Sequence, residues 1–151
     1  PTPAVKPYRA GRPDTTLRAT KEHVVRNLGR ETFRTLDTRT REEYLGEQAS
    51  GPGTDSSIYR NGRIPGAVHV PWDDGATEDG SFRPAGELAR MYAESGLRAD
   101  HEIVPYCRLG VRASYSWFVL KYLLGYERVR NYDGSWTEWG NATGVPIEKG
   151  E

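Results

Sequence analysis

The sequence predicts an α/β domain built on a central, mostly parallel five-stranded sheet with helices on both faces. Strand and helix signals alternate along the chain from residue 17 onward, which is typical of parallel sheets covered on both sides. Glycine and proline separate these signals at most of the expected turns. The length of 151 residues suits one domain with one core.

The first half of the chain contains three predicted strands with two helices among them. The strands are short apolar or β-branched runs, and they cover residues 17–19, 32–37 and 67–70. The helix over 21–28 has one apolar face and ends at Gly29. Residues 41–45 form a shorter helical turn.

The second half contains two predicted strands, over residues 102–106 and 128–132. Pro84 opens a helix with an apolar face, and Gly96 stops it. The loop 107–112 leads directly into a strongly apolar helix over 113–124. A Ser-x-x-Glu capping box at Ser135 starts a final short helix.

Two segments lack such signals. Residues 1–14 hold four prolines among polar neighbours, and we expect a linker or strap that leads into a domain over 15–151. The polar stretch 46–63 is long for a loop, and loops of this length are usually functional lids or disordered segments.

The composition excludes several classes of function. Twenty-one basic and 21 acidic side chains give no net attraction to nucleic acid or to a membrane. No apolar run approaches the roughly 20 residues that span a bilayer. Three scattered histidines and one cysteine have no zinc-ligand spacing, so no metal site is expected. A single cysteine also excludes an intrachain disulfide, and we expect a cytoplasmic protein.

The single cysteine, Cys107, lies where the strand 102–106 meets the helix 113–124. A strand–loop–helix junction directs successive backbone N–H groups and the positive end of a helix at one point, which favours a thiolate. The alternative is an inert core cysteine, which would place two arginines beside a buried structural thiol at a high cost. Cys107 is therefore predicted to be a nucleophile.

Four segments carry a further pattern, namely Leu36-Asp37-Thr38-Arg39 with Glu42-Glu43-Tyr44, Gly62 to Ala67, Cys107 to Arg112, and Asn131 to Trp139. In this order and spacing they resemble the rhodanese family of sulfurtransferases, and closely the C-terminal catalytic domain of tandem-domain thiosulfate sulfurtransferases. The resemblance implies a rhodanese-like single domain. It also implies an inactive upstream rhodanese domain of the same protein, absent from this chain and joined through the proline-rich start.

The resemblance implies a reaction in two halves. The Cys107 thiolate takes the outer sulfur of thiosulfate as a persulfide, and cyanide or another thiophilic acceptor removes it. No cofactor is needed. The small-molecule donor would be bound by the loop residues Arg108, Leu109, Gly110, Val111 and Arg112. Asp37 and Trp136 would support the site, although Asp37 could equally cap a helix.

The loop departs from the best-known thiosulfate pattern at two positions. Leu109 replaces a lysine, and Arg112 replaces a small hydroxyl residue, which relocates positive charge and affects the rate and the acceptor preference. Either Arg108 or Arg112 could hold the sulfonate end of the donor. Each arginine could instead brace the loop by pairing with Asp37 or another carboxylate.

Other functions stay open as alternatives. The relatives that use 3-mercaptopyruvate tend to carry glycine and serine in the loop, where this chain has Arg108. Cysteine phosphatases place five residues between the cysteine and an arginine, whereas only four separate Cys107 from Arg112, and Ala113 stands at the phosphatase position. A non-catalytic rhodanese module would not need the retained cysteine and arginines.

Two further residues lie at unusual positions inside predicted strands. His69 lies inside a predicted strand and is expected to be a satisfied core residue rather than a catalyst. Pro105 would remove a hydrogen bond from a central strand, which suggests that the neighbouring strand has already ended there.

Overall fold

The computed structural model describes residue 7, residues 9–48 and residues 58–151. In chain order the elements are α1 (Lys21–Asn27), β1 (Phe33–Asp37), α2 (Arg41–Leu45), β2 (Val68–His69), the 3-10 helix η1 (Trp72–Gly75), α3 (Ala85–Glu94), β3 (Glu102–Tyr106), α4 (Val111–Phe118), the π-helix η2 (Val119–Leu123) and α5 (Ser135–Trp139). No helix in these described ranges is long and apolar enough to cross a membrane.

The sheet is parallel and has the strand order β2-β1-β3. Its register aligns Asp37 with His69 on one side and with Tyr106 on the other, so the carboxyl ends of all three strands lie level. Reactive crevices of parallel sheets lie at this edge. Cys107 is the first residue after β3, and the fold therefore delivers the thiol to that edge.

The prediction of five strands is wrong in number, because the described residues form a sheet of three. The segment 128–132 lies beside β3, and the segment 17–19 lies beside 128–132, but each of these pairings is a single isolated parallel bridge. These bridges are Ile103 with Val129 and Arg18 with Asn131.

Pro105 explains why pairing beside β3 stops at one bridge. Its carbonyl accepts a hydrogen bond from the N–H of Tyr132 at 3.1 Å, but proline has no N–H to complete a second bridge. The neighbouring segment therefore runs past Pro105, and the expectation that it ends earlier is wrong.

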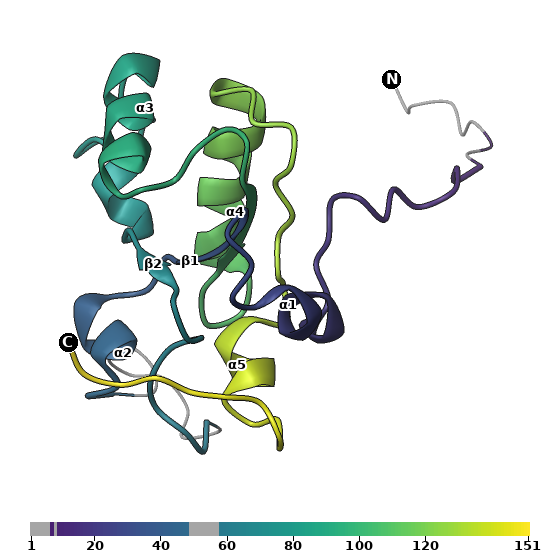
Figure 1. Cartoon of the computed structure of the whole chain (residues 1–151). Helices are drawn as coiled ribbons and strands as arrows, with labels where there is room; N and C mark the ends of the chain where they lie inside the picture. The colour runs from purple at the N-terminus through teal and green to yellow at the C-terminus, as the bar shows by residue number, and fades with distance from the viewer. Residues whose placement is uncertain (1–6, 8, 49–57) are drawn as a thin grey trace, which may run out of the picture.

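Two apolar clusters cover the two faces of the sheet. Side chains of successive strand residues point to opposite faces, so Val104 joins one cluster and Ile103 the other. The first cluster includes Val24 of α1 and Trp136 of α5, and the second includes Leu88 of α3. Figure 1 shows α3 and α4 on one side of the sheet and α1 and α5 on the other. Helices on both faces are thus present.

The linker and the long polar loop are described only in part. Residues 1–6 and 8 of the expected linker, and residues 49–57 of the stretch 46–63, lie outside the described residues. Residues 9–14 are exposed and have no regular secondary structure. In Figure 1 they run away from the body of the domain.

Candidate active site at Cys107

The loop after β3 folds back on the cysteine sulfur. Cys107 is 1% exposed, and the N–H of Gly110 donates to its Sγ at 3.1 Å. Gly110 has a φ of 85°, and a Cβ at this position would lie 2.8 Å from the Cα of Asp133. Only glycine satisfies both conditions without strain. The helix α4 begins at the next residue, two positions earlier than the sequence indicates, so its positive end also faces the loop.

The backbone of Cys107 is fixed by the first residues of α5. The Cys107 N–H donates to the hydroxyl of Ser135 at 3.0 Å, and this hydroxyl donates to the carbonyl of Tyr132 at 2.7 Å. The N–H of Trp136 donates to the Cys107 carbonyl at 2.9 Å. Ser135 has a φ of 51° and is the one non-glycine residue with positive φ among the described residues. Such strain persists where the surroundings over-determine a position, often at functional sites.

The expected capping box at Ser135 is wrong. No side chain of the described residues caps α5, and the Ser135 hydroxyl accepts from the backbone of Cys107 instead of from the helix. Glu138 accepts a hydrogen bond from the phenol of Tyr132 at 2.7 Å. Both partners of the expected box are therefore used by contacts that connect α5 to the segment before it.

Replacing Ser135 with alanine should leave the buried Cys107 N–H without an acceptor. Such a group costs about 1–3 kcal/mol, and the loss should appear as a lower midpoint of urea unfolding and slower alkylation of Cys107. Ser95→Ala is the control, since it removes a serine hydroxyl that bonds Met91 at the end of α3. Equal and small losses in both variants would show that Ser135 does not hold the loop.

Arg112, which lies in the first turn of α4, is paired with a carboxylate. Its Nη1 and Nη2 atoms donate to the two oxygens of Glu43 at 2.7 and 3.0 Å, and the Glu43 side chain is 0% exposed. Burial lowers the pKa of Arg112, but the hydrogen bonds and charge of Glu43, with help from Cys107, outweigh it and raise this pKa above its usual value. The Arg112 guanidinium is thus fixed on Glu43, five positions after Cys107 in the chain.

The other loop arginine, Arg108, forms no ion pair within the part of the chain that the structure describes. Its carbonyl accepts from the N–H and the hydroxyl of Thr137 at 3.0 and 2.9 Å. Its Nε is buried and has no hydrogen-bond partner among the described residues, and no described carboxylate forms an ion pair with it. Leu109 and Val111 are 55% and 74% exposed, so they form the outer rim of the loop.

A fully buried ion pair lies under the loop, at the end of β1. Asp37 accepts from the backbone N–H, the Nε and the Nη2 of Arg39, with the shortest contact at 2.6 Å, and also from the phenol of Tyr106 at 2.7 Å. Burial lowers the pKa of Arg39, but the charge and hydrogen bonds of Asp37 raise it overall. Burial and the Asp37 charge together raise the pKa of Tyr106. Asp37 thus orients Arg39 rather than a loop arginine or a helix.

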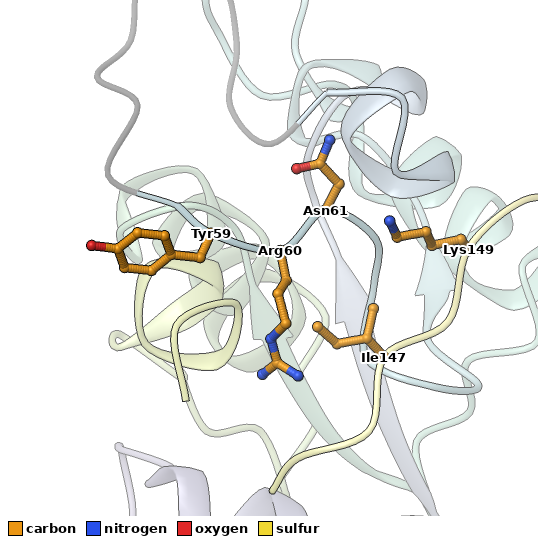
Figure 2. Close-up of a pocket in the computed structure, with 5 residues that line it drawn as sticks. All are labelled: Tyr59, Arg60, Asn61, Ile147 and Lys149. Carbon is orange, nitrogen blue, oxygen red and sulfur yellow. The ribbon is translucent and has the colours of Figure 1, made fainter. Parts of the chain in front are cut away.

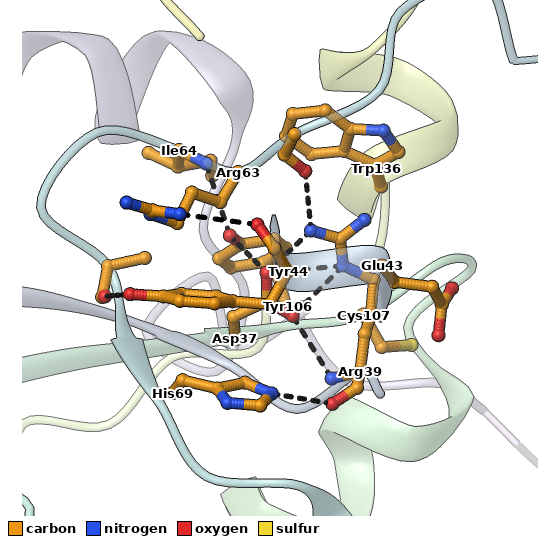
Figure 3. A network of polar contacts seen from close by, with 12 residues as sticks. Asp37, Arg39, Glu43, Tyr44, Arg63, Ile64, His69, Tyr106, Cys107 and Trp136 are labelled. Atoms are coloured by element: carbon orange, nitrogen blue, oxygen red, sulfur yellow. Dashed lines mark hydrogen bonds and ion pairs between the residues drawn. The ribbon is translucent and has the colours of Figure 1, made fainter. Parts of the chain in front are cut away.

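Figure 3 shows the surroundings of this pair. The Arg39 guanidinium stacks over the ring of Trp136, 4.6 Å from the centroid. His69 stacks on Tyr44 with 4.4 Å between ring centroids and bonds the Arg39 carbonyl at 2.9 Å. His69 is thus a satisfied residue, as expected. The Nη1 of Arg39 is buried without a partner among the described residues.

Sequence reasoning missed Arg39, Glu43 and Ser135 as site residues. Arg39 could have been found, because it follows the strand-end aspartate by two positions and a buried acid needs a partner. Glu43 and Ser135 lie 69 and 28 residues from their loop partners, and no local signal connects them.

A separate hollow of about 590 Å³ lies among Tyr59, Arg60, Asn61, Ile147 and Lys149 (Figure 2). Its arginine is already used, since the guanidinium of Arg60 donates to backbone carbonyls at and after the end of α5. Cys107 does not line this hollow. It is therefore not part of the cysteine site.

Comparison with known proteins decides the family. Residues 20–142 match the rhodanese-like domain. The chain belongs to the rhodanese family. This agrees with the resemblance seen in the sequence, and the fold and the loop around Cys107 are those of a rhodanese domain.

Curated relatives with this rhodanese domain have names related to sulfur transfer. A protein of Mycolicibacterium smegmatis named "Putative thiosulfate sulfurtransferase" is 46% identical over 144 residues, which are 95% of this chain and 51% of the relative. The sulfur carrier protein TtuD of Thermus thermophilus is 46% identical over 151 residues, covering 96% of this chain and 51% of TtuD. The chain thus spans about half the length of these relatives.

Solved structures give the same fold. The anaerobic ergothioneine biosynthesis enzyme of Chlorobium limicola, bound to trimethyl histidine, aligns with a TM-score of 0.81 at 28% identity, over 91% of this chain and 33% of the enzyme. A structure of EanB, with ergothioneine covalently linked to a cysteine persulfide, aligns with a TM-score of 0.81 at 29% identity, over 90% of this chain and 32% of EanB.

Proposed function

We propose that this rhodanese domain transfers the sulfane sulfur of thiosulfate to cyanide or another thiophilic acceptor through a persulfide on Cys107. The observation that carries the proposal is the Gly110 N–H directed at the sulfur of Cys107, in a loop that ends at the start of α4. These groups stabilise negative charge on the sulfur in both the thiolate and the persulfide form.

The reaction balances without a cofactor. The thiolate attacks the outer sulfur of thiosulfate, a new S–S bond forms, and the old one breaks with its electron pair leaving on sulfite. The acceptor then attacks the outer sulfur of the persulfide, and the S–S bond to Cys107 breaks to return the thiolate. Ping-pong kinetics are expected from two such half-reactions.

The charges around the sulfur support Arg108 as the residue that holds the donor. Asp37 balances Arg39, and Glu43 balances Arg112, so these four side chains sum to zero. Among the described residues Arg108 is the loop cation without an ion-pair partner, and its buried Nε has no hydrogen-bond partner there. A guanidinium fork suits a sulfonate, which carries three oxygens and negative charge.

Intact-mass measurement tests the proposed function. Incubation with thiosulfate should add the mass of one sulfur atom to the chain, and cyanide should remove it and yield thiocyanate. A chain whose mass does not change with thiosulfate, in its reduced and active-thiol form, would overturn the proposal.

Replacing Arg108 with alanine should affect donors unequally. Losing one charge-assisted contact costs about 1.5–3 kcal/mol, so kcat/KM for thiosulfate should fall roughly ten- to a hundredfold. A neutral persulfide donor should lose much less. Steady-state assays with both donors check this, with the exposed Arg90→Ala of α3 as a control. Equal losses for both donors would mean that Arg108 only shapes the loop.

The alternative donor, 3-mercaptopyruvate, has a carboxylate in place of the sulfonate, and the same assays distinguish the two. A phosphatase has no support from a specific contact, since Glu43 occupies the fork of Arg112. A non-catalytic module would leave the Gly110 N–H at the Cys107 sulfur without a purpose.

We further propose that an upstream rhodanese domain accompanies this one, joined through the linker 1–14. The half of each relative that this chain does not span supports this proposal. A cytoplasmic location fits a reactive thiol that must stay reduced.

A further inference from the structure

We propose that Glu43 is a positioning residue that holds Arg112 against the sulfur of Cys107. The proposal rests on the proposed function, because it assigns Arg112 to the thiolate and leaves the donor to Arg108. The observation behind it is the fully buried carboxylate of Glu43 on the short helix α2. This carboxylate accepts hydrogen bonds from both terminal nitrogens of Arg112.

The geometry of Glu43 leaves Arg112 little freedom. Glu43 accepts from both terminal nitrogens of Arg112 and from the backbone N–H of Thr40, the last at 3.1 Å. A bidentate guanidinium–carboxylate pair fixes the orientation of both groups as well as their separation. The loop end is thereby tied to α2, which directly follows β1 and the buried pair Asp37–Arg39.

Among the described residues, two cations interact with Glu43. Arg112 belongs to α4, and Arg39 follows β1 and is held by Asp37. Tyr106 ends β3, and Cys107 follows it. In the view of Figure 3, the Glu43 carboxylate and the Cys107 sulfur lie on the same side of Arg39. Glu43 therefore has two possible effects on the thiolate with opposite signs.

The negative charge of Glu43 disfavours the Cys107 thiolate, whereas the Arg112 cation that Glu43 holds in place favours the thiolate. If positioning dominates, removing Glu43 frees Arg112, and a higher pH is needed to ionise the thiol. If the charge of Glu43 dominates, its removal lets the thiol ionise at lower pH. The direction of the change distinguishes the two effects.

Glu43 could also have a purely structural role as the cap of α2. It forms a capping box with Thr40, whose hydroxyl accepts from the Glu43 N–H at 3.4 Å. Thr40→Ala removes this cap but keeps the Glu43 carboxylate. It should lower stability without changing the chemistry of Cys107.

The experiment is a double-mutant cycle between Glu43→Gln and Arg112→Met, with Glu42→Gln as the matched control on the exposed side of α2. The first measurement is the pH dependence of Cys107 alkylation by iodoacetamide, which requires no sulfur transfer. It therefore reports on Glu43 even if thiosulfate proves not to be the donor. The second is kcat and KM with thiosulfate and cyanide.

We expect Glu43→Gln to move the alkylation midpoint to higher pH and to lower kcat about tenfold, with a smaller change in KM. In the Arg112→Met background, Glu43→Gln should have little further effect on the alkylation midpoint or on kcat, because Glu43 acts through Arg112. Glu42→Gln and Thr40→Ala should match the wild type in both measurements.

Three results would overturn the proposal. The first is an alkylation midpoint that is unchanged or lower in Glu43→Gln than in the wild type. The second is a Glu43→Gln substitution that lowers kcat equally in the wild-type and Arg112→Met backgrounds. The third is a Thr40→Ala variant that shifts the alkylation midpoint of Cys107 as Glu43→Gln does. If Glu43→Gln fails to fold, Glu43→Asp serves instead, since it keeps the charge but shortens the side chain. The alkylation midpoint is again expected to move to higher pH, and an unchanged or lower midpoint again overturns the proposal.

Discussion

Cys107→Ser should abolish sulfur transfer while leaving the fold intact. A serine hydroxyl is not ionised near neutral pH and cannot carry a persulfide, so neither the sulfur adduct nor turnover above the uncatalysed rate is expected. The change is close to isosteric at a residue that is 1% exposed. Intact mass after thiosulfate treatment and thiocyanate formation measure the two effects.

The control is internal, because the chain has no second cysteine. An adduct that persists in Cys107→Ser would have to lie on another type of residue, and persistent turnover would remove Cys107 from the mechanism. Urea unfolding of the variant, measured in parallel, ensures that lost activity does not reflect lost structure.

Asp37→Asn should strongly destabilise the domain. The amide keeps the shape of the side chain but leaves the Arg39 charge buried without a counter-ion, and both side chains are 0% exposed in the native protein. Breaking a buried pair in this way costs about 3–5 kcal/mol. The midpoint of urea unfolding at neutral pH should fall accordingly, and the site around Trp136 should loosen with it.

Two comparisons test the cause. Asp100→Asn breaks the exposed pair with Arg98 and should leave the unfolding midpoint nearly unchanged. Replacing both members of the buried pair with apolar residues, Asp37→Leu with Arg39→Met, should cost less than Asp37→Asn alone, since no charge then remains unpaired. An unfolding midpoint for Asp37→Asn equal to that of the wild type would contradict the structural role of the pair.

The elements that agree with the sequence are those specified by short-range patterns. The strand over 102–106 and the helix over 41–45 have the predicted bounds, and β1 begins one residue later than expected. Apolar runs and turn residues act over a few positions, so they can be read locally. The strand at 128–132 is not regular because pairing also depends on the neighbour, and Pro105 interrupts the pairing with β3. The segment 17–19 has only this irregular segment to pair with.

The same distinction applies to the site. The nucleophile, the glycine and the two arginines of the loop were all visible in the sequence, because the chemistry of a thiolate requires N–H donors and positive charge nearby. The partner of each arginine was not visible. Each could have held the donor or paired with a carboxylate. The fold pairs Arg112 with Glu43, whereas Arg108 has no ion-pair partner among the described residues.

By itself the sequence determined the family, the strand–loop–helix junction and the position of Cys107 at its centre, since these depend on contiguous residues. Only the tertiary structure decided that Glu43 pairs with Arg112, that Ser135 holds the Cys107 backbone, and that Asp37 serves Arg39. The first two contacts join segments far apart in the chain. The third lies within one turn, but the choice of partner depends on which groups are buried together, because a buried charge must be paired wherever the fold brings a counter-charge within reach.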